Sequence, residues 1–257
     1  MLAYELAQTR ARLGDAHPDT LDLLGRFALL LHRTGKLREA EPLFRETLAG
    51  RKRALGDAHP GTLSSINNLA MLLQDQGKLE AAEPLCREAL EGRRRALGDA
   101  HPETLNSTNN LAMLLQDQGK LVAAEPLIRE ALEGQRRALG HAHPHTLKSI
   151  NNLAMLLKAQ GKLDAAEPLC RKALEGNRRA LGDAHPRTLT SINNLALLLE
   201  MQGKLEAAEL LFREALASNR GARGPAHPDT VACTQSLVRL RSARDKQREA
   251  AALPRSA

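Results

Sequence analysis

Residues 57–98 read DAHPGTLSSINNLAMLLQDQGKLEAAEPLCREALEGRRRALG, and residues 99–140 repeat this stretch with changes at only six of its 42 positions. The dipeptide His-Pro recurs at the same interval, beginning at residues 17, 59, 101, 143, 185 and 227. A fixed period of this length is the sequence signature of one supersecondary unit stacked many times. Each unit then buries its apolar face on its neighbours, which predicts an elongated solenoid in place of one globular core.

One repeat predicts two antiparallel helices. Pro60 fits the first turn of a helix, because its missing N–H needs no partner there, and apolar residues recur at three- and four-residue steps over residues 63–73. Gly77 ends this first helix, called helix A, since glycine readily adopts the left-handed conformation. A second apolar stripe over residues 79–90 predicts helix B, which the short Gly-Lys linker forces to run antiparallel to helix A.

A proline recurs inside the predicted helix B. It is Pro84 in the repeat quoted above, and it returns as Pro42, Pro126 and Pro168. Proline removes one backbone hydrogen bond, so we expect a regular kink that helps to set the curvature of the array. The alternative is that helix B begins later than residue 79.

The order of small and large core positions resembles the tetratricopeptide repeat. The residues that carry this resemblance are Leu69-Ala70, Gly77, Ala82, Cys86 and Ala89-Leu90. The usual repeat has 34 residues; the longer form here, with Leu-Gly-x-x-His-Pro, Asn-Asn-Leu-Ala, Gly-Lys and Ala-Glu-Pro-Leu, is similar to the kinesin light chain and nephrocystin type. The resemblance implies an all-α solenoid of helix-turn-helix units wound into a right-handed superhelix, with helix A lining a concave groove.

The repeat pattern predicts the domain organisation. Five tandem repeats cover residues 15–224, at 15–56, 57–98, 99–140, 141–182 and 183–224. Residues 1–14 align with the later part of a helix B and predict a partial helix B or an N-terminal cap. Residues 225–257 predict a C-terminal capping helix, because Asp245-Lys246 replaces the Gly-Lys turn, followed by a frayed tail at 254–257.

Composition argues against several classes of protein. No apolar run approaches the roughly 18 residues of a membrane span. Cys86 and Cys170 occupy one repeat position two repeats apart, too far to form a disulfide, which favours a reducing, cytoplasmic location. The net charge of +7 comes largely from short basic clusters such as Arg93-Arg94-Arg95 at the predicted ends of helices B. Cations there complement the helix dipole, so we do not expect nucleic-acid binding.

The polar residues of helix A are the candidate binding site, because the apolar stripe must face helix B. The groove residues that this reasoning selects are Asn67, Asn68, Met71, Asp75, Asn109, Asn110, Met113, Asp117, Asn151, Asn152, Met155, Asn193 and Asn194. An asparagine amide both donates and accepts, which matches the N–H and C=O groups of an extended peptide. Family members similarly use the second asparagine to hold a ligand main chain. The alternative is that one asparagine of each pair bonds only the adjacent repeat.

These features predict a non-catalytic scaffold or adaptor that binds an extended peptide or partner helix as a monomer. No nucleophile motif, phosphate-binding loop or Cys-x-x-Cys is present, and we interpret the histidines of His141-Ala-His143-Pro-His145 as drift from the Asp-Ala-His-Pro of other repeats, so we expect neither enzymatic activity nor a metal or other cofactor. Kinesin light chains carry a heptad coiled coil before their repeats. This chain begins within a helix B pattern, so the sequence does not predict binding to kinesin heavy chain. The alternative function is the repeat arm of a larger signalling or sensor protein.

Overall fold

The computed structural model describes residues 2–252, and these residues form twelve α-helices and no β-strand. The predicted all-α fold is therefore confirmed, while the predicted frayed tail at 254–257 lies outside the described residues. In chain order the helices are α1 (Leu2–Leu13), α2 (Pro18–Arg33), α3 (Leu37–Leu55), α4 (Pro60–Asp75), α5 (Leu79–Leu97), α6 (Pro102–Asp117), α7 (Leu121–Leu139), α8 (Pro144–Ala159), α9 (Leu163–Leu181), α10 (Pro186–Met201), α11 (Leu205–Arg223) and α12 (Pro228–Ala252).

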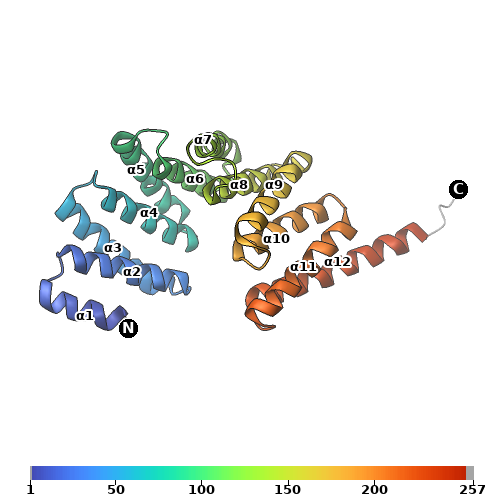
Figure 1. The fold of residues 1–257 in the computed structure, drawn as a ribbon, viewed down its shortest axis with the longest axis horizontal. Helices are drawn as coiled ribbons and strands as arrows, with labels where there is room; N and C mark the ends of the chain where they lie inside the picture. Colours follow the sequence, from blue (N-terminus) through green and yellow to red (C-terminus); the bar gives the residue numbers. More distant parts are fainter. Residues whose placement is uncertain (1, 253–257) are drawn as a thin grey trace. The chain divides into compact units, whose positions relative to one another are not determined.

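The chain divides into an N-terminal unit, Met1–Ala138, and a C-terminal unit, Leu139–Ala257. In the N-terminal unit α1 to α5 each pack against the next helix in the chain, and in the C-terminal unit α8 to α11 do the same (Figure 1). Helices A also touch each other, since α2 contacts α4, α4 contacts α6, and α8 contacts α10. Within each unit, therefore, helices A form one layer and helices B the other.

Local signals set the ends of helix A. His59 precedes α4 in an extended conformation, and its ring Nδ1 accepts a hydrogen bond from the Gly61 N–H at 3.0 Å. Gly77 has a φ of +74° and ends the helix, while the Lys78 N–H donates to the Leu73 carbonyl at 2.8 Å. These contacts satisfy backbone groups that a helix end leaves without partners.

The predicted apolar stripe is the core of the repeat. In α4 the side chains of Leu63, Ile66, Leu69, Ala70, Leu72 and Leu73 are all buried. In α5 the small residues Ala82, Cys86 and Ala89 are buried as well. Helix α5 runs through Pro84 without a break, so the alternative of a later start for helix B is wrong. The kink at this proline stays a prediction.

A glycine on helix B lets the two helices of a repeat approach closely. A Cβ atom added to Gly92 would lie 2.4 Å from a methyl carbon of Leu63 in α4, a contact too short to persist. The same pairing recurs between Gly134 of α7 and Leu105 of α6, at 2.5 and 2.8 Å from the two methyl carbons. The leucine of helix A therefore fills the space that a side chain on helix B would occupy.

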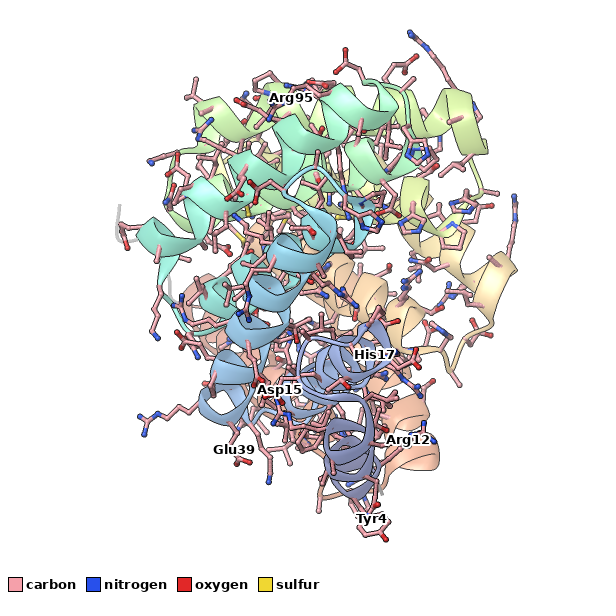
Figure 2. The ribbon with its side chains drawn as sticks, turned by 90° about the vertical axis from the view of Figure 1, so that its left-hand side faces the viewer. Tyr4, Arg12, Asp15, His17, Glu39 and Arg95 are labelled. Atoms are coloured by element: carbon pink, nitrogen blue, oxygen red, sulfur yellow. The ribbon has the colours of Figure 1, made fainter. Side chains whose placement is uncertain are left out.

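The two terminal helices differ from the repeats between them. Helix α1 packs on α2 through the buried Leu6, while Tyr4 is 72% exposed and projects away from the ribbon (Figure 2). Helix α12 continues without a turn through residues 245–246, as the loss of the Gly-Lys pair predicts. Its Arg241 and Arg244 bind the buried carboxylate of Glu209 in α11.

Candidate functional site

The predicted site residues all lie on helices A, at recurring positions of α4, α6, α8 and α10. Their exposure varies: Met71, Asp75 and Asp117 are exposed; Asn68, Asn110, Met113, Asn151, Met155, Asn193 and Asn194 are half-buried; Asn67, Asn109 and Asn152 are buried. We call the side of helices A that carries these residues the helix A face. It comprises α2, α4 and α6 in the N-terminal unit and α8 and α10 in the C-terminal unit.

Asparagine amides join successive helices A. In the N-terminal unit Asn110 Nδ2 donates to Asn67 Oδ1 at 2.8 Å, and Asn67 Nδ2 contacts Met71 Sδ at 3.4 Å. In the C-terminal unit Asn194 Nδ2 donates to Asn151 Oδ1 at 3.0 Å. The alternative reading of the asparagine pairs, that they bond the adjacent repeat, therefore holds for these side chains. Asn110 and Asn194 each retain the carbonyl oxygen and the second Nδ2 proton for a ligand.

An apolar position follows the asparagines by one helical turn. It holds Leu29, Met71 and Met113 in the N-terminal unit, where the first two are each 37% exposed. In the C-terminal unit the same position holds Met155 and Leu197, both half-buried. Methionine adapts its shape to different partners, so this row offers apolar contact without a fixed shape requirement.

The acidic side chains of the helix A face bind side chains of neighbouring helices A. The His32 ring Nε2 lies 2.5 Å from Asp75 Oδ2, and Gln74 Nε2 donates to Asp117 Oδ2 at 2.5 Å. Asp75 and Asp117 therefore connect helices A, as the asparagines do, and they remain open to solvent on their other side.

The basic clusters do more than complement the helix dipole, which the sequence analysis missed. Arg93 is 5% exposed, and its guanidinium donates to Ser107 Oγ at 2.8 Å and to Ser64 Oγ at 3.2 Å. Burial lowers the pKa of Arg93, although the carboxylate of Glu103 at 3.0 Å opposes this shift. Arg94 pairs with Glu130 of the next helix B at 2.7 Å. Two members of this cluster thus hold repeats together and are not free for a ligand.

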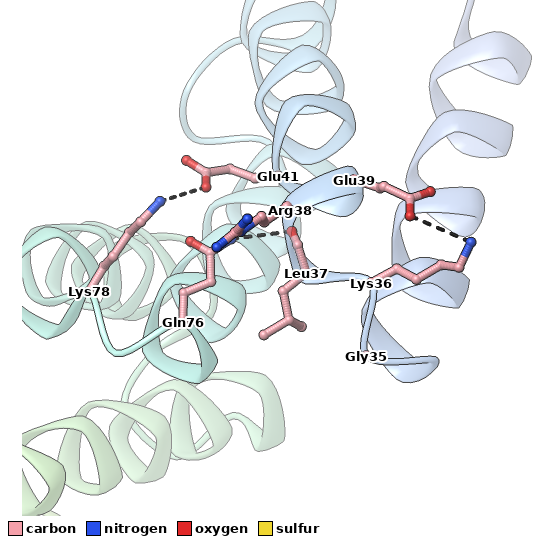
Figure 3. A pocket seen from close by; sticks show the side chains of 8 residues that line it. All are labelled: Gly35, Lys36, Leu37, Arg38, Glu39, Glu41, Gln76 and Lys78. Carbon is pink, nitrogen blue, oxygen red and sulfur yellow. Dashed lines mark hydrogen bonds and ion pairs between the residues drawn. The ribbon is translucent and has the colours of Figure 1, made fainter.

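Pockets lined mainly by charged and polar residues lie at the turns between helix A and helix B. One of about 630 Å³ is lined by Gly35, Lys36, Leu37, Arg38, Glu39, Glu41, Gln76 and Lys78 (Figure 3). Glu41 Oε2 accepts from Lys78 Nζ at 2.8 Å, and this bond, with a second from Arg45, lowers the pKa of Glu41 from 4.5 to about 2. The equivalent Glu83 binds Lys120 in the same way at 2.9 Å. These groups clamp one repeat to the next.

The cysteine thiols and the potential metal ligands of the described residues were the next candidates for a site. Cys86 and Cys170 are buried and free, and desolvation raises the pKa of each thiol to about 11. Within the described part of the chain, no three or more His, Cys, Asp or Glu side chains group in a way that would hold a metal ion. No described helix is both long and apolar enough to span a membrane.

Comparison with known proteins agrees with this architecture. The family described as tetratricopeptide repeat matches residues 19–95, 61–137, 105–169 and 146–221, which together cover most of the chain. The chain belongs to the tetratricopeptide repeat family. Among curated proteins, none has a sequence that matches this tetratricopeptide repeat chain.

Solved structures of tetratricopeptide repeat proteins share the fold. A candidate kinesin light chain from Podosopora anserina with nearly identical TPR-like repeats is 26% identical, with a TM-score of 0.64 over 80% of this chain and 98% of that one. BtubC (BKLC) from P. vanneervenii is 23% identical, with a TM-score of 0.67 over 88% of this chain and 89% of that one. NprR, solved with its cognate peptide NprX, is 16% identical, with a TM-score of 0.67 over 96% of this chain and 67% of that one.

Proposed function

We propose that this protein is a non-catalytic interaction scaffold, similar to kinesin light chains in its repeats, that binds an extended peptide or a partner helix on the helix A face. The observation that carries the proposal is the repetition of one surface. Each of α4, α6, α8 and α10 presents an asparagine pair followed one turn later by methionine or leucine. A surface that repeats along an array suits a ligand that is itself a repeating chain.

The chemistry of the face supports a peptide ligand. The amide oxygens of Asn110 and Asn194 are acceptors for peptide N–H groups, and each such hydrogen bond is worth about 0.5–1.5 kcal/mol. Within the N-terminal unit, the row of Leu29, Met71 and Met113 adds apolar contact on the same face as Asn110. NprR, which shares the fold, was solved with a bound peptide, and this is a precedent for the same use of the fold here.

Charge and cysteine chemistry favour a protein partner in a reducing cytoplasm. Arg93 and Arg94 are engaged in contacts between repeats, which leaves less of the net positive charge for phosphate groups. The three cysteines are buried and form no disulfide among the described residues, in agreement with a reducing compartment. We expect the protein to act as a monomer.

The test compares apolar-to-acidic substitutions on and off the face. The variant Met71→Glu/Met113→Glu places charges in the apolar row, whereas Val122→Glu makes the same kind of change at a residue of α7 that is 87% exposed. Protein and variants are applied to an array of random 12-residue peptides, with thermal melts to confirm folding. We expect the double variant to lose the bound peptides and Val122→Glu to keep them. Equal retention by all three proteins would refute binding on this face.

A further inference from the structure

The chain of amide bonds between helices A is incomplete at α4. Asn110 Nδ2 donates one hydrogen bond to Asn67, but the position in α2 that corresponds to Asn67 is Gly25, which has no side chain. Within residues 2–252, the side chain of Asn68 has no hydrogen-bond partner. Its amide is half-buried on the helix A face, so both its donor and its acceptor are open to a ligand.

A free positive charge occupies the matching position on α2. Arg26 corresponds to Asn68 in the repeat, is exposed, and forms no ion pair or hydrogen bond among the described residues. The acid one turn before it, Asp22, is bound to Arg51. The nearest acid position on α4, Asp75, is bound to His32. Among the described residues, none of the three carboxylates of the two helices, Asp19, Asp22 and Asp75, forms an ion pair with Arg26.

Two exposed apolar side chains lie one turn further along the same helices. Leu29 follows Arg26 by three residues in α2, and Met71 follows Asn68 by three residues in α4. Each is 37% exposed, and residues three apart share one face of a helix. Helices α2 and α4 are in contact, so the four side chains belong to one continuous part of the helix A face.

We propose that Arg26, Asn68, Leu29 and Met71 form the principal anchor of the ligand and that it selects an acidic side chain. The Arg26 guanidinium binds an Asp or Glu carboxylate of an extended peptide, for which its fork of N–H groups is suited. The Asn68 amide donates to and accepts from the adjacent peptide unit, and a neighbouring apolar residue rests on Leu29 and Met71. This anchor rests on the peptide-binding function proposed above.

The anchor differs from the asparagine positions that follow it. At Asn110 one of the two amide protons is already donated to Asn67, whereas Asn68 has both protons and its carbonyl oxygen available to a ligand. We therefore expect Asn68→Ala to weaken peptide binding by about twofold to tenfold and Asn110→Ala to weaken it less. Loss of the charge-assisted bond in Arg26→Gln should weaken binding by about tenfold to hundredfold.

Gly25 offers a test that adds a group where the other variants remove one. A Cβ atom at residue 25 would lie 3.5 Å from Thr47 Cγ2, an ordinary contact, so the first side-chain atom fits there. Gly25→Asn supplies the amide acceptor that Asn67 provides for Asn110, and it should engage Asn68 and weaken peptide binding. Gly25→Ala is the matched control and should leave binding unchanged.

The probe is an array of random 12-residue peptides, acetylated and amidated at their ends, in matched pairs that differ only by Glu or Gln. We expect wild-type protein to prefer the Glu member, Arg26→Gln to lose that preference, and Arg53→Gln, a change at an exposed arginine of α3, to keep it. Anisotropy titrations with the strongest pairs then measure the affinities of the Asn68 and Gly25 variants.

The outcomes separate the anchor from the function on which it rests. If peptides bind without an acidic preference, or if Arg26→Gln keeps that preference, the anchor is refuted while peptide binding on the helix A face stands. The same peptides with a free C-terminal carboxylate form a second array, and if binding appears only on that array, the choice of an acidic side chain is wrong. If no peptide is retained, the proposed function fails and the anchor fails with it.

Discussion

Replacing Gly134 with alanine should destabilise the N-terminal unit, although alanine is the better helix former. The new Cβ would lie 2.5 and 2.8 Å from the two methyl carbons of Leu105, a side chain that is only 2% exposed. Overpacking of this kind costs about 1–3 kcal/mol. Replacing glycine with alanine inside a helix raises the free energy of unfolding by about 1 kcal/mol when no contact opposes it.

Gly25→Ala measures the effect of helix propensity alone on the free energy of unfolding, because Gly25 lies inside α2 and its added Cβ makes no contact shorter than 3.5 Å. The two variants should therefore differ by about 1–3 kcal/mol in free energy of unfolding, with Gly25→Ala the more stable. Urea denaturation followed by circular dichroism measures this difference. Each kcal/mol also corresponds to about 2–4 °C in Tm for a chain of this size.

A double-mutant cycle checks the cause. In a Leu105→Ala background, which itself costs about 2–5 kcal/mol, the added methyl group at Gly134 enters vacant space and its penalty should disappear. A Gly134→Ala variant as stable as Gly25→Ala would refute the close approach of helix A to helix B at this glycine.

Three other outcomes follow from particular contacts. The pKa of Glu83 is lowered from 4.5 to about 2, chiefly by its bond to Lys120, so the contribution of Glu83 to folding stability is complete above about pH 4.5 and is lost as the pH falls toward 2. Glu83→Gln should therefore lower the free energy of unfolding by up to about 1 kcal/mol at pH 7 and by almost nothing at pH 2. Urea titration at both pH values measures this difference. Cys86 and Cys170 should react with a thiol reagent at pH 8 only slowly unless urea is present, because burial raises the pKa of both thiols to about 11; rapid native labelling would contradict this. His101→Ala removes the side-chain cap of α6 and should lower the free energy of unfolding by about 1 kcal/mol in the same urea assay.

The helices and their buried stripe could be predicted because their causes are local. A proline after His59 and a glycine at residue 77 bound α4, and the intervals between Leu63 and Leu73 place their side chains on one face. These signals depend on residues within a few positions of each other, and the repetition of the pattern reinforces each of them.

The candidate site could be predicted only in part, because contacts between repeats depend on how two helices are rotated about their axes. The sequence placed Asn68 and Asn110 on one face, but it did not show that Asn110 bonds Asn67 while Asn68 is left open opposite Gly25. Arg93 looked like one member of a basic surface cluster. Its burial depends on serines 14 and 29 residues away in the chain.

The contacts between repeats also bear on how such a chain changes over generations. Lys52 of α3 binds Glu88 of α5 and Arg94 of α5 binds Glu130 of α7, so these successive helices B offer the same kind of cation to the same kind of acid in the next repeat. Loss of the DNA that encodes residues 57–98 would bring Lys52 to Glu130, with no incompatible pair at the new junction. Recombination between near-identical coding segments can therefore shorten or extend the array by whole repeats, and selection acts on how many helices A a ligand meets while their fit to one another is preserved.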